Sequence, residues 1–372
     1  MKGVLGIIFS NMHEHLVSEL TSIRCMGSIP IGGRYRLVDF ALSSMTNSGI
    51  TEVGVITKSN YQSLLDHLGS GRAWDLSRKQ GGLVMLPPFS RVTSGGMYRS
   101  RVDALAGVME YIRASRAEYV LTMDCDMLAN MDLRPFFEAH KESEAEISVM
   151  YHRAPLPGKA NKDTSVLTIG DNGFVTDMLI NPQLQGTQDI CLNVMVISIK
   201  YLEKLLDYCL SRSLYSFERD ALQPEVKEGR VFAWKYDGYV SCVDCLSTYF
   251  DSNMALLDSD VRRALFPQSR PVYTKVRDIA PARYGLDSKV GNSLIADGCL
   301  IEGEVENSVL FRGVTVEKGV KIKNSVVMQG TRVGANSMLD YVISDKNVQI
   351  REGRNLSGYG TYPIYIAKGS SI

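Results

Sequence analysis

The sequence predicts an α/β domain with a mainly parallel sheet, followed by a C-terminal left-handed parallel β-helix. Two observations carry this prediction. Up to about residue 257, short apolar runs alternate with longer amphipathic stretches, as in successive βα units. Beyond residue 285, aliphatic residues recur at a spacing of six with small residues between them, which is typical of hexapeptide solenoids.

The α/β pattern begins with an uncharged apolar strand over residues 4–9. Further strand-length runs follow at 53–57, 119–123, 147–151 and 194–199. Amphipathic stretches predict helices over 38–48, 102–115 and 199–211. Ligands of such sheets bind at the carboxyl ends of the strands, so we expect any site of the first domain there.

A segment of mixed charge with three prolines, RRALFPQSRPVYTKVRDIAPARYG, separates the two patterns. This composition suits a linker. We therefore predict a first domain over residues 1–257, a linker over 258–285 and a β-helix over 286–372.

The solenoid pattern rests on three aliphatic pairs that keep the six-residue spacing: Ile295 with Ile301, Val316 with Ile322, and Val333 with Leu339. Asn-Ser dipeptides recur at 292, 307 and 324, where turns are expected. Each coil then buries one aliphatic side chain per face, and the flat sides of the solenoid are natural interfaces.

Composition excludes several classes of partner. Basic and acidic residues number 41 each, which leaves no overall positive field for nucleic acid. No apolar run reaches the length of a membrane span, and the start does not resemble a secretion signal. Seven scattered cysteines, an odd number, favour reduced thiols, so we expect a cytoplasmic protein.

The loop after the first strand reads SNMHEH over residues 10–15. In α/β nucleotide-binding proteins this turn is normally rich in glycine, which allows backbone N–H groups to hold phosphates. Here it contains no glycine, lysine or arginine. The loop therefore lacks the usual means of binding a triphosphate.

The segment PIGGRYRLVDFALSSMTNSGI, residues 30–50, closely resembles the bacterial glucose-1-phosphate adenylyltransferases. The motifs AWDL at 73–76, GG at 81–82 and LPP at 86–88 match as well, and the resemblance covers nearly the whole chain. It implies a Rossmann-like nucleotidyltransferase domain joined to a left-handed β-helix. It also implies tetramers that make ADP-glucose from ATP and glucose 1-phosphate with Mg²⁺.

The family's opening loop, GGxGxRL, aligns with residues 11–17. Its glycines become Asn11, Met12 and Glu14, and its arginine becomes Leu16. Glycines allow the backbone to approach the triphosphate, and the arginine neutralises charge on the leaving pyrophosphate. Glu14 would instead place a carboxylate against a polyanion.

Other positions depart from the family in the same direction. A family lysine becomes Met26, the lysine that binds the sugar phosphate becomes Asn181, and an aspartate that helps to hold Mg²⁺ becomes Cys242. A nucleotide-binding segment, Gly-Thr-Ala-Asp-Ala, becomes SRVDA at 100–104. Asp126 alone keeps the family's catalytic, metal-binding aspartate. Each lost phosphate contact is worth about two decades of rate.

Asp124 and Asp126 form a D-x-D pattern at a strand end, which many glycosyltransferases use to hold a metal-bound sugar nucleotide. The flanking sequence fits the adenylyltransferases instead. Two interpretations stay open: a remnant metal site at Asp126, and polar residues that only cap the strand. We favour the second.

Three other patterns have an ordinary structural explanation. The Cys242-x-x-Cys245 pair has no second cysteine pair to complete a zinc site, so we expect packing rather than redox or metal chemistry. For His13-Glu-His15 we favour a solvated loop over a metal site. All five histidines lie at or before residue 152, so the β-helix lacks the histidine base of hexapeptide acyltransferases.

Arg34 and Arg36 lie beside two glycines, in a neighbourhood where the family binds phosphorylated activators between its domains. Such a group can form an anion site. We favour the alternative, in which the two arginines join the sheet to its neighbour through Asp39.

Together the departures imply the GlgD type of this family, a non-catalytic, regulatory subunit. We expect a GlgC-type catalytic partner in a heterotetramer, with Mg²⁺ required by that partner and no cofactor required by this chain. A small phosphorylated effector is a further expected ligand. The alternative is an active sugar-phosphate nucleotidyltransferase with a rebuilt phosphate loop.

Overall fold

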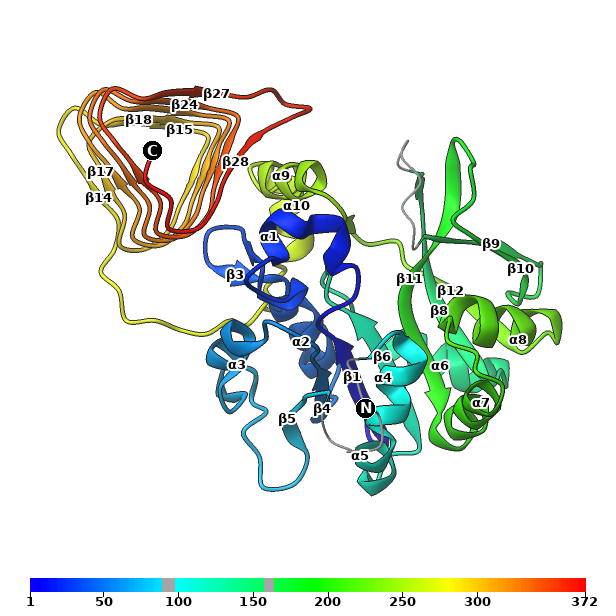
Figure 1. Ribbon diagram of the computed structural model, residues 1–372. Coiled ribbons are helices and arrows are strands. Elements are labelled where there is room, and N and C mark those ends of the chain that lie inside the picture. The colour runs from blue at the N-terminus through cyan, green and yellow to red at the C-terminus, as the bar shows by residue number, and fades with distance from the viewer. Residues whose placement is uncertain (89–97, 157–163) are drawn as a thin grey trace.

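The computed structural model describes residues 1–88, 98–156 and 164–372 of the chain. It consists of an α/β part around one large sheet and a triangular solenoid, seen almost end-on in Figure 1. The predicted fold class is confirmed. Among the described residues, no helix has the length and apolar character needed to cross a membrane.

The large sheet contains nine strands, seven of them in the order β10-β9-β11-β6-β1-β4-β5. The parallel half consists of β5 (Gly82–Leu86), β4 (Glu52–Ile56), β1 (Val4–Phe9) and β6 (Tyr119–Asp124). The other half is mixed: β8 (Ile147–Pro155), β9 (Ser165–Ile169), β10 (Val175–Ile180), β11 (Thr187–Ser198) and β12 (Val231–Lys235). The carboxyl ends of β1 and β6 therefore lie side by side, since Phe9 pairs with Asp124.

The helices of the α/β part are α1 (Ser18–Thr21), α2 (Leu37–Asn47), α3 (Gln62–Leu68), α4 (Arg101–Gly107), α5 (Met109–Ala114), α6 (Arg134–Ser143), α7 (Ile199–Ser211), α8 (Gln223–Lys227), α9 (Leu246–Ala255) and α10 (Ser259–Leu265). The predicted helix over 102–115 is broken into α4 and α5. Gly107 ends α4, and glycine weakens a helix interior; a Cβ added there would lie 2.6 Å from the ring of Tyr98.

Fifteen short strands form the three sheets of the β-helix. The first contains β14 (Arg283–Tyr284), β17 (Leu300–Ile301), β20 (Thr315–Val316), β23 (Arg332–Val333) and β26 (Gln349–Ile350). The second contains β15 (Lys289–Gly291), β18 (Glu304–Glu306), β21 (Lys321–Lys323), β24 (Met338–Asp340) and β27 (Asn355–Ser357). The third contains β16 (Leu294–Ile295), β19 (Val309–Leu310), β22 (Val326–Val327), β25 (Val342–Ser344) and β28 (Ile364–Ile366).

The six-residue spacing takes the chain from one face of the solenoid to the next. Val316 lies in the first sheet and Ile322 in the second, and both are fully buried. The Asn-Ser turns also have a clear role: Asn292, Asn307 and Asn324 adopt left-handed φ values of 38° to 45°. Asparagine tolerates this conformation better than other residues with a Cβ.

The two parts share one hydrophobic core. Phe40 and Tyr249 of the α/β part pack in the same cluster as Phe311 and Ile343 of the β-helix. In Figure 1 the β28 side of the solenoid faces α9 and α10. The first coil begins at Arg283, and the segment before it crosses from α10 to the solenoid.

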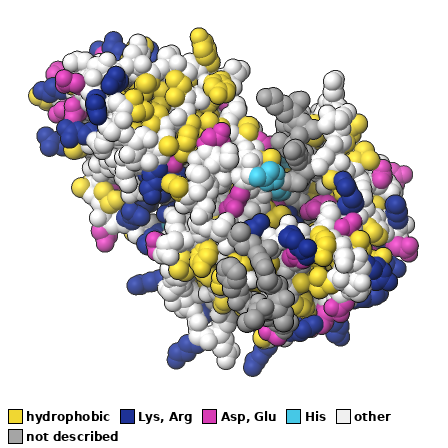
Figure 2. Space-filling model, viewed as in Figure 1, with side chains coloured by type: hydrophobic (Ala, Val, Ile, Leu, Met, Phe, Trp, Pro, Cys, Tyr) yellow, Lys and Arg dark blue, Asp and Glu magenta, His cyan; other side chains and the backbone are white. Residues whose placement is uncertain are grey.

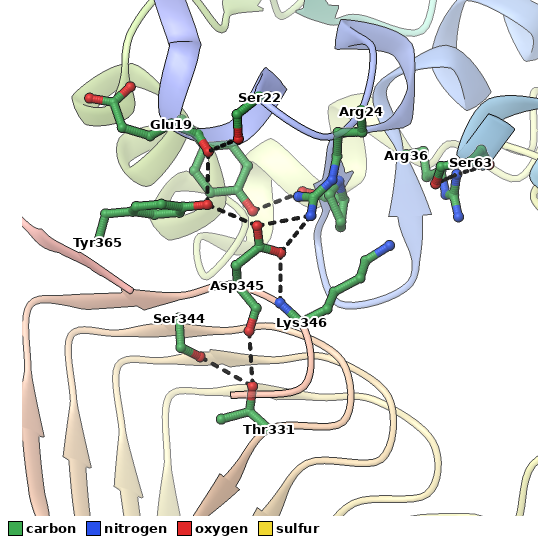
Figure 3. A network of polar contacts seen from close by, with 12 residues as sticks. Glu19, Ser22, Arg24, Arg36, Ser63, Thr331, Ser344, Asp345, Lys346 and Tyr365 are labelled. Atoms are coloured by element: carbon green, nitrogen blue, oxygen red, sulfur yellow. Dashed lines mark hydrogen bonds and ion pairs between the residues drawn. The ribbon is translucent and has the colours of Figure 1, made fainter. Parts of the chain in front are cut away.

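A buried ion pair links the parts as well (Figure 3). Arg24 donates from Nη2 to both oxygens of Asp345, at 2.7 and 2.8 Å. Tyr365 donates to Asp345 or to the carbonyl of Glu19, each at 2.8 Å. This network fixes the opening segment of the chain to the last coils of the solenoid.

Candidate functional site

A pocket of about 580 Å³ opens at the carboxyl ends of β1 and β6, where ligands of α/β sheets bind. Its walls come from the loop over residues 10–15, from Lys58, from the start of α4 and from the helical turn η4 (Phe217–Leu222). Figure 2 shows histidine side chains surfacing near the middle of this face, with acidic side chains beside them. Several of the predicted site residues line this pocket.

Arg101, the first residue of α4, provides the central charge of this pocket. Its two Nη atoms each donate to one oxygen of Asp124 at 2.8 Å, and its Nε lies 3.4 Å from Glu218. The guanidinium also lies over the ring of Phe9, 4.6 Å from the centroid. Burial alone would lower the pKa of Arg101, but the ion pair with Asp124 outweighs it and raises that pKa, so the guanidinium stays charged.

This pair changes the interpretation of the D-x-D pattern. Asp124 is fully buried and is half of an ion pair rather than an exposed cap on the strand. The sequence marks Arg101 only as a departure within residues 100–104. Its partner lies 23 positions away, so the pair emerges only from the packing of α4 over the ends of β1 and β6.

The remaining aspartate, Asp126, contacts His13. The distance from His13 Nδ1 to Asp126 Oδ2 is 2.6 Å, and both side chains are largely buried. His13 has a left-handed backbone, with φ of 62°, which directs its side chain into the pocket rather than along the surface. The expectation of a solvated loop is therefore wrong for His13, because the turn folds back over the strand ends.

Glu14 is turned inward too. Its Oε1 accepts hydrogen bonds from the side-chain amide of Asn11 at 2.6 Å and from the backbone N–H of Met26 at 3.2 Å. Burial raises the pKa of Glu14 to about 7. Asn11 in turn accepts a hydrogen bond from the backbone N–H of Lys58 at 2.8 Å. A carboxylate of the chain thus occupies backbone and amide donors at the mouth of the pocket.

The other predicted site positions take part in packing or backbone geometry, and Met12 and Asn181 also line the pocket. Met26 is fully buried, and Met12 and Leu16 pack against the two neighbouring hydrophobic clusters. Asn181 has a left-handed backbone, and its Oδ1 accepts from the N–H of Thr164 at 3.0 Å.

The two cysteines of the C-x-x-C pattern are free thiols in different settings. Cys242 is exposed at the end of the short strand β13 (Ser241–Cys242), which pairs with β7 (Met127–Leu128). Cys245 caps α9, where its Sγ accepts from the N–H of Thr248 at 3.4 Å. Capping gives Cys245 a structural role.

The Mg²⁺ that the resemblance implies does not fit the donors present. One potential ligand atom each from His13, Asp124 and Asp126 lies within 4.8 Å of the other two. Arg101, however, occupies both oxygens of Asp124. Position 242, for which the resemblance implies a carboxylate ligand, has a thiol. Mg²⁺ requires hard oxygen ligands in a near-octahedral arrangement.

Arg34 and Arg36 lie at a second place, the junction between the α/β part and the β-helix. The Arg36 side chain donates to the carbonyl and hydroxyl oxygens of Ser63, while only its backbone N–H reaches Asp39. Arg34 is exposed. The expected link through Asp39 is therefore made by the backbone of Arg36, not by a guanidinium.

These two arginines line a small cleft together with Arg277, Arg312 and Lys346. The lining includes no described Asp or Glu. Its free space of about 30 Å³ has room for one or two waters, so exposed side chains such as that of Arg34 must rearrange around a larger anion.

Two cations of this cleft, Lys346 and Arg312, have lowered pKa values. Burial lowers the pKa of Lys346 to about 7, and the charges of Arg36 and Arg24 contribute to that shift. Burial and the charges of Arg34 and Arg277 lower the pKa of Arg312. In Figure 3 the amine of Lys346 extends away from Asp345, toward the side on which Arg36 lies. We name this group, Arg34, Arg36, Arg277, Arg312 and Lys346, the basic cleft.

Comparison with known proteins matches each part of the chain to a family, and the whole chain to full-length relatives. Residues 17–230 match the family described as nucleotidyl transferase, and residues 280–358 match the family described as GlmU-like, C-terminal hexapeptide. The glycogen biosynthesis protein GlgD of Bacillus subtilis (strain 168) is 32% identical over 369 residues, which cover 98% of this chain and 96% of that protein.

Catalytic relatives match over almost the same length. The glucose-1-phosphate adenylyltransferase of Bacillus mycoides (strain KBAB4) is 30% identical over 91% of this chain and 90% of its own. That of Clostridium perfringens (strain 13 / Type A) is 29% identical over 89% of this chain and 85% of its own. The chain therefore belongs to the glucose-1-phosphate adenylyltransferase family and is similar to its GlgD members.

Proposed function

We propose that this chain is a regulatory, non-catalytic subunit of an ADP-glucose pyrophosphorylase in glycogen biosynthesis. It would assemble with a GlgC-type catalytic subunit, most simply as a heterotetramer, and bind a small phosphorylated effector in the basic cleft. The observation that carries the proposal is the cleft itself, where five cations converge and no described acidic residue lines the walls.

The state of the strand-end pocket supports the non-catalytic half of the proposal. Arg101 is already paired with Asp124, and Nδ1 of His13 lies 2.6 Å from Asp126. Glu14 occupies donors that could otherwise face a phosphate. A triphosphate would have to displace several of these contacts and would meet a carboxylate at the loop.

The basic cleft supports the regulatory half. Arginine binds phosphate oxygens through two parallel hydrogen bonds, and several converging cations suit a multiply charged anion. The cleft is built from both parts of the chain, with Arg36 from one and Arg312 from the other. An anion bound there would hold the α/β part and the β-helix together. This restraint would couple effector binding to a neighbouring subunit.

The test measures ADP-glucose synthesis by this chain alone, by the glucose-1-phosphate adenylyltransferase of the same organism alone, and by the two mixed. We expect negligible synthesis by this chain and an altered rate or effector response in the mixture. Substantial turnover by this chain alone would overturn the proposal and support the alternative of an active enzyme. A mixture that behaves as the catalytic protein does by itself would remove the regulatory role.

The role of the cleft is tested in the same mixture with Arg34→Ala. We expect the concentration of phosphorylated effector needed for half-maximal response to rise, while the rate without effector stays the same. Lys321→Ala, which removes an exposed cation from the β-helix away from the cleft, is the matched control. An unchanged response curve in Arg34→Ala would exclude that residue.

A further inference from the structure

We infer that Arg101 is a built-in cation that replaces the divalent metal at the strand ends, so that this pocket is folded and neutralised without a metal ion. The inference concerns the strand-end pocket only. It holds whichever anion the basic cleft binds.

The first step is the geometry of the pair. Two parallel hydrogen bonds of 2.8 Å join the guanidinium to the two oxygens of Asp124. This bidentate arrangement is the strongest that a carboxylate makes with a side chain, and it uses both oxygens at once. Arg101 is 4% exposed and Asp124 is fully buried, so water does not compete with the pair.

Arg101 contacts more than one acidic group. Its Nε also lies 3.4 Å from Glu218, which belongs to a different element, η4. A single side chain at the start of α4 thus links the end of β6 to η4, as a metal bound by carboxylates from two elements would. The aromatic face of Phe9 supports the same cation from the other side.

Arg101 also keeps a divalent metal ion out of the site. Asp124 lies close enough to His13 and Asp126 for the three to share an ion, but its oxygens are already occupied. Asp126 is itself paired, with His13 at 2.6 Å. A divalent ion entering here would have to displace a buried guanidinium and would be repelled by its charge if it did not.

The test measures Mn²⁺ binding, by the loss of free-ion signal in electron paramagnetic resonance, together with melting temperature. For the wild-type chain we expect no binding tighter than about 1 mM, the weak end of protein sites, and no rise in melting temperature with Mn²⁺. Arg101→Met should bind Mn²⁺ at least about tenfold more tightly, because the competing charge is gone and two carboxylates remain. Its melting temperature should then rise with Mn²⁺.

Two variants assign the effect to this pocket. The double variant Arg101→Met, Asp124→Asn should lose the gained binding. The matched control is Arg99→Met, which removes a neighbouring exposed arginine whose partner is Asp103 and should leave binding as in the wild type.

Two outcomes would overturn the inference. One is a folded Arg101→Met protein that binds Mn²⁺ no better than the wild type. The other needs no folded variant at position 101: wild-type protein that binds Mn²⁺ at submillimolar concentration and loses that binding in Asp126→Asn. Neither depends on catalytic activity, so they are distinct from failure of the proposed regulatory function.

Discussion

The strand-end pocket and the basic cleft both contain buried or half-buried arginines, yet their charges are balanced in opposite ways. In the pocket, Arg101 has Asp124 and Glu218 as partners, and His13 has Asp126. In the cleft, burial and neighbouring positive charges lower the pKa of Arg312 and of Lys346. No described acidic residue lines the walls, and Arg312 Nε lies 3.9 Å from Asp297. Paired charge serves the fold, whereas unbalanced charge is what a ligand of opposite sign can use.

Under the proposed function, the comparison also explains how a chain can keep the fold of its family without the chemistry. Nucleotide pockets contain charges that their ligands normally neutralise. When the ligand is lost, those charges must be removed or paired, since an isolated buried charge is strongly unfavourable. Arg101 then stands in for the positive charge of a metal ion, and Glu14 for the negative charge of a phosphate.

The largest expected effect tests paired charge beside the cleft. Asp345→Ala should lower the free energy of unfolding by about 3–5 kcal/mol, because it leaves Arg24 buried without its partner. Chemical denaturation measures this loss. The double variant Arg24→Met, Asp345→Leu should recover much of it.

The control for this prediction is Glu306→Ala, whose partner Lys323 is about half exposed. That variant should change stability by less than about 1 kcal/mol. If Asp345→Ala were equally mild, the pairs at the junction would not be the structural elements that we take them for.

The next effect tests unbalanced charge. Arg312→Ala should weaken binding of sulfate or of a hexose bisphosphate by about tenfold or more, since a hydrogen bond to a charged group contributes about 1.5–3 kcal/mol. Arg312 is only 8% exposed and is one of two cations that the β-helix contributes to the cleft, the other being Lys346. Isothermal titration calorimetry gives the affinity. An unchanged affinity would mean that the anion binds elsewhere.

A smaller effect concerns pH. Because burial lowers the pKa of Lys346 to about 7, the free cleft has this amine partly neutral at pH 7, and a bound anion favours its protonation. Arg24, Arg36, Asp345 and Lys368 are the charged groups that act on it. Sulfate binding should therefore weaken by about threefold to tenfold from pH 6 to pH 8.

Sulfate is the suitable probe here because its own charge is constant over this range. Lys346→Arg retains its charge at every pH tested, so its binding curve should be nearly flat. A wild-type curve as flat as that of the variant would contradict the role of Lys346.

The smallest effect concerns Glu14 and tests whether its ionised carboxylate destabilises the folded chain. Burial raises its pKa in the folded chain to about 7 from 4.5, so the folded state holds a proton that the unfolded state releases. Stability should fall as pH rises from about 4.5 to about 7 and stay level above that. Glu14→Gln keeps the Oε1 acceptor and removes the ionisable group, and with it this dependence of stability on pH.

We therefore expect Glu14→Gln to melt about 1–2 °C above the wild type at pH 8, with a smaller difference at pH 5. Differential scanning calorimetry at the two pH values measures it. A lower melting temperature for the variant at pH 8 would show that the ionised carboxylate stabilises the loop.

Several parts of the site were within reach of the sequence. The absence of glycine and of basic residues in the opening loop follows from reading positions 10–16 in order. Burial of Met26 follows from its apolar side chain, and Arg34 and Arg36 stand beside two glycines. These are local properties, so neighbours in the chain are enough to suggest them.

The partners of the charged groups could not be predicted from the sequence. His13 meets Asp126 across 113 positions, and Arg24 meets Asp345 across 321. The sequence suggested a solvated loop for the first, and nothing in it marked the second. No periodicity encodes such distances, because they depend on how the sheet and the solenoid are placed against each other.

Sequence by itself determined the two-part architecture, since strand alternation and the six-residue aliphatic spacing are repeated, local and set by which side chains must be buried. It also predicts, through the resemblance, which phosphate contacts of the family are missing. Only the tertiary structure decided which charges are neutralised and which are available, because charge interactions act through space and join residues from separate elements. For that reason the pairing of Arg101 with Asp124, and the gathering of five cations at the junction, belong to the fold rather than to any segment of the chain.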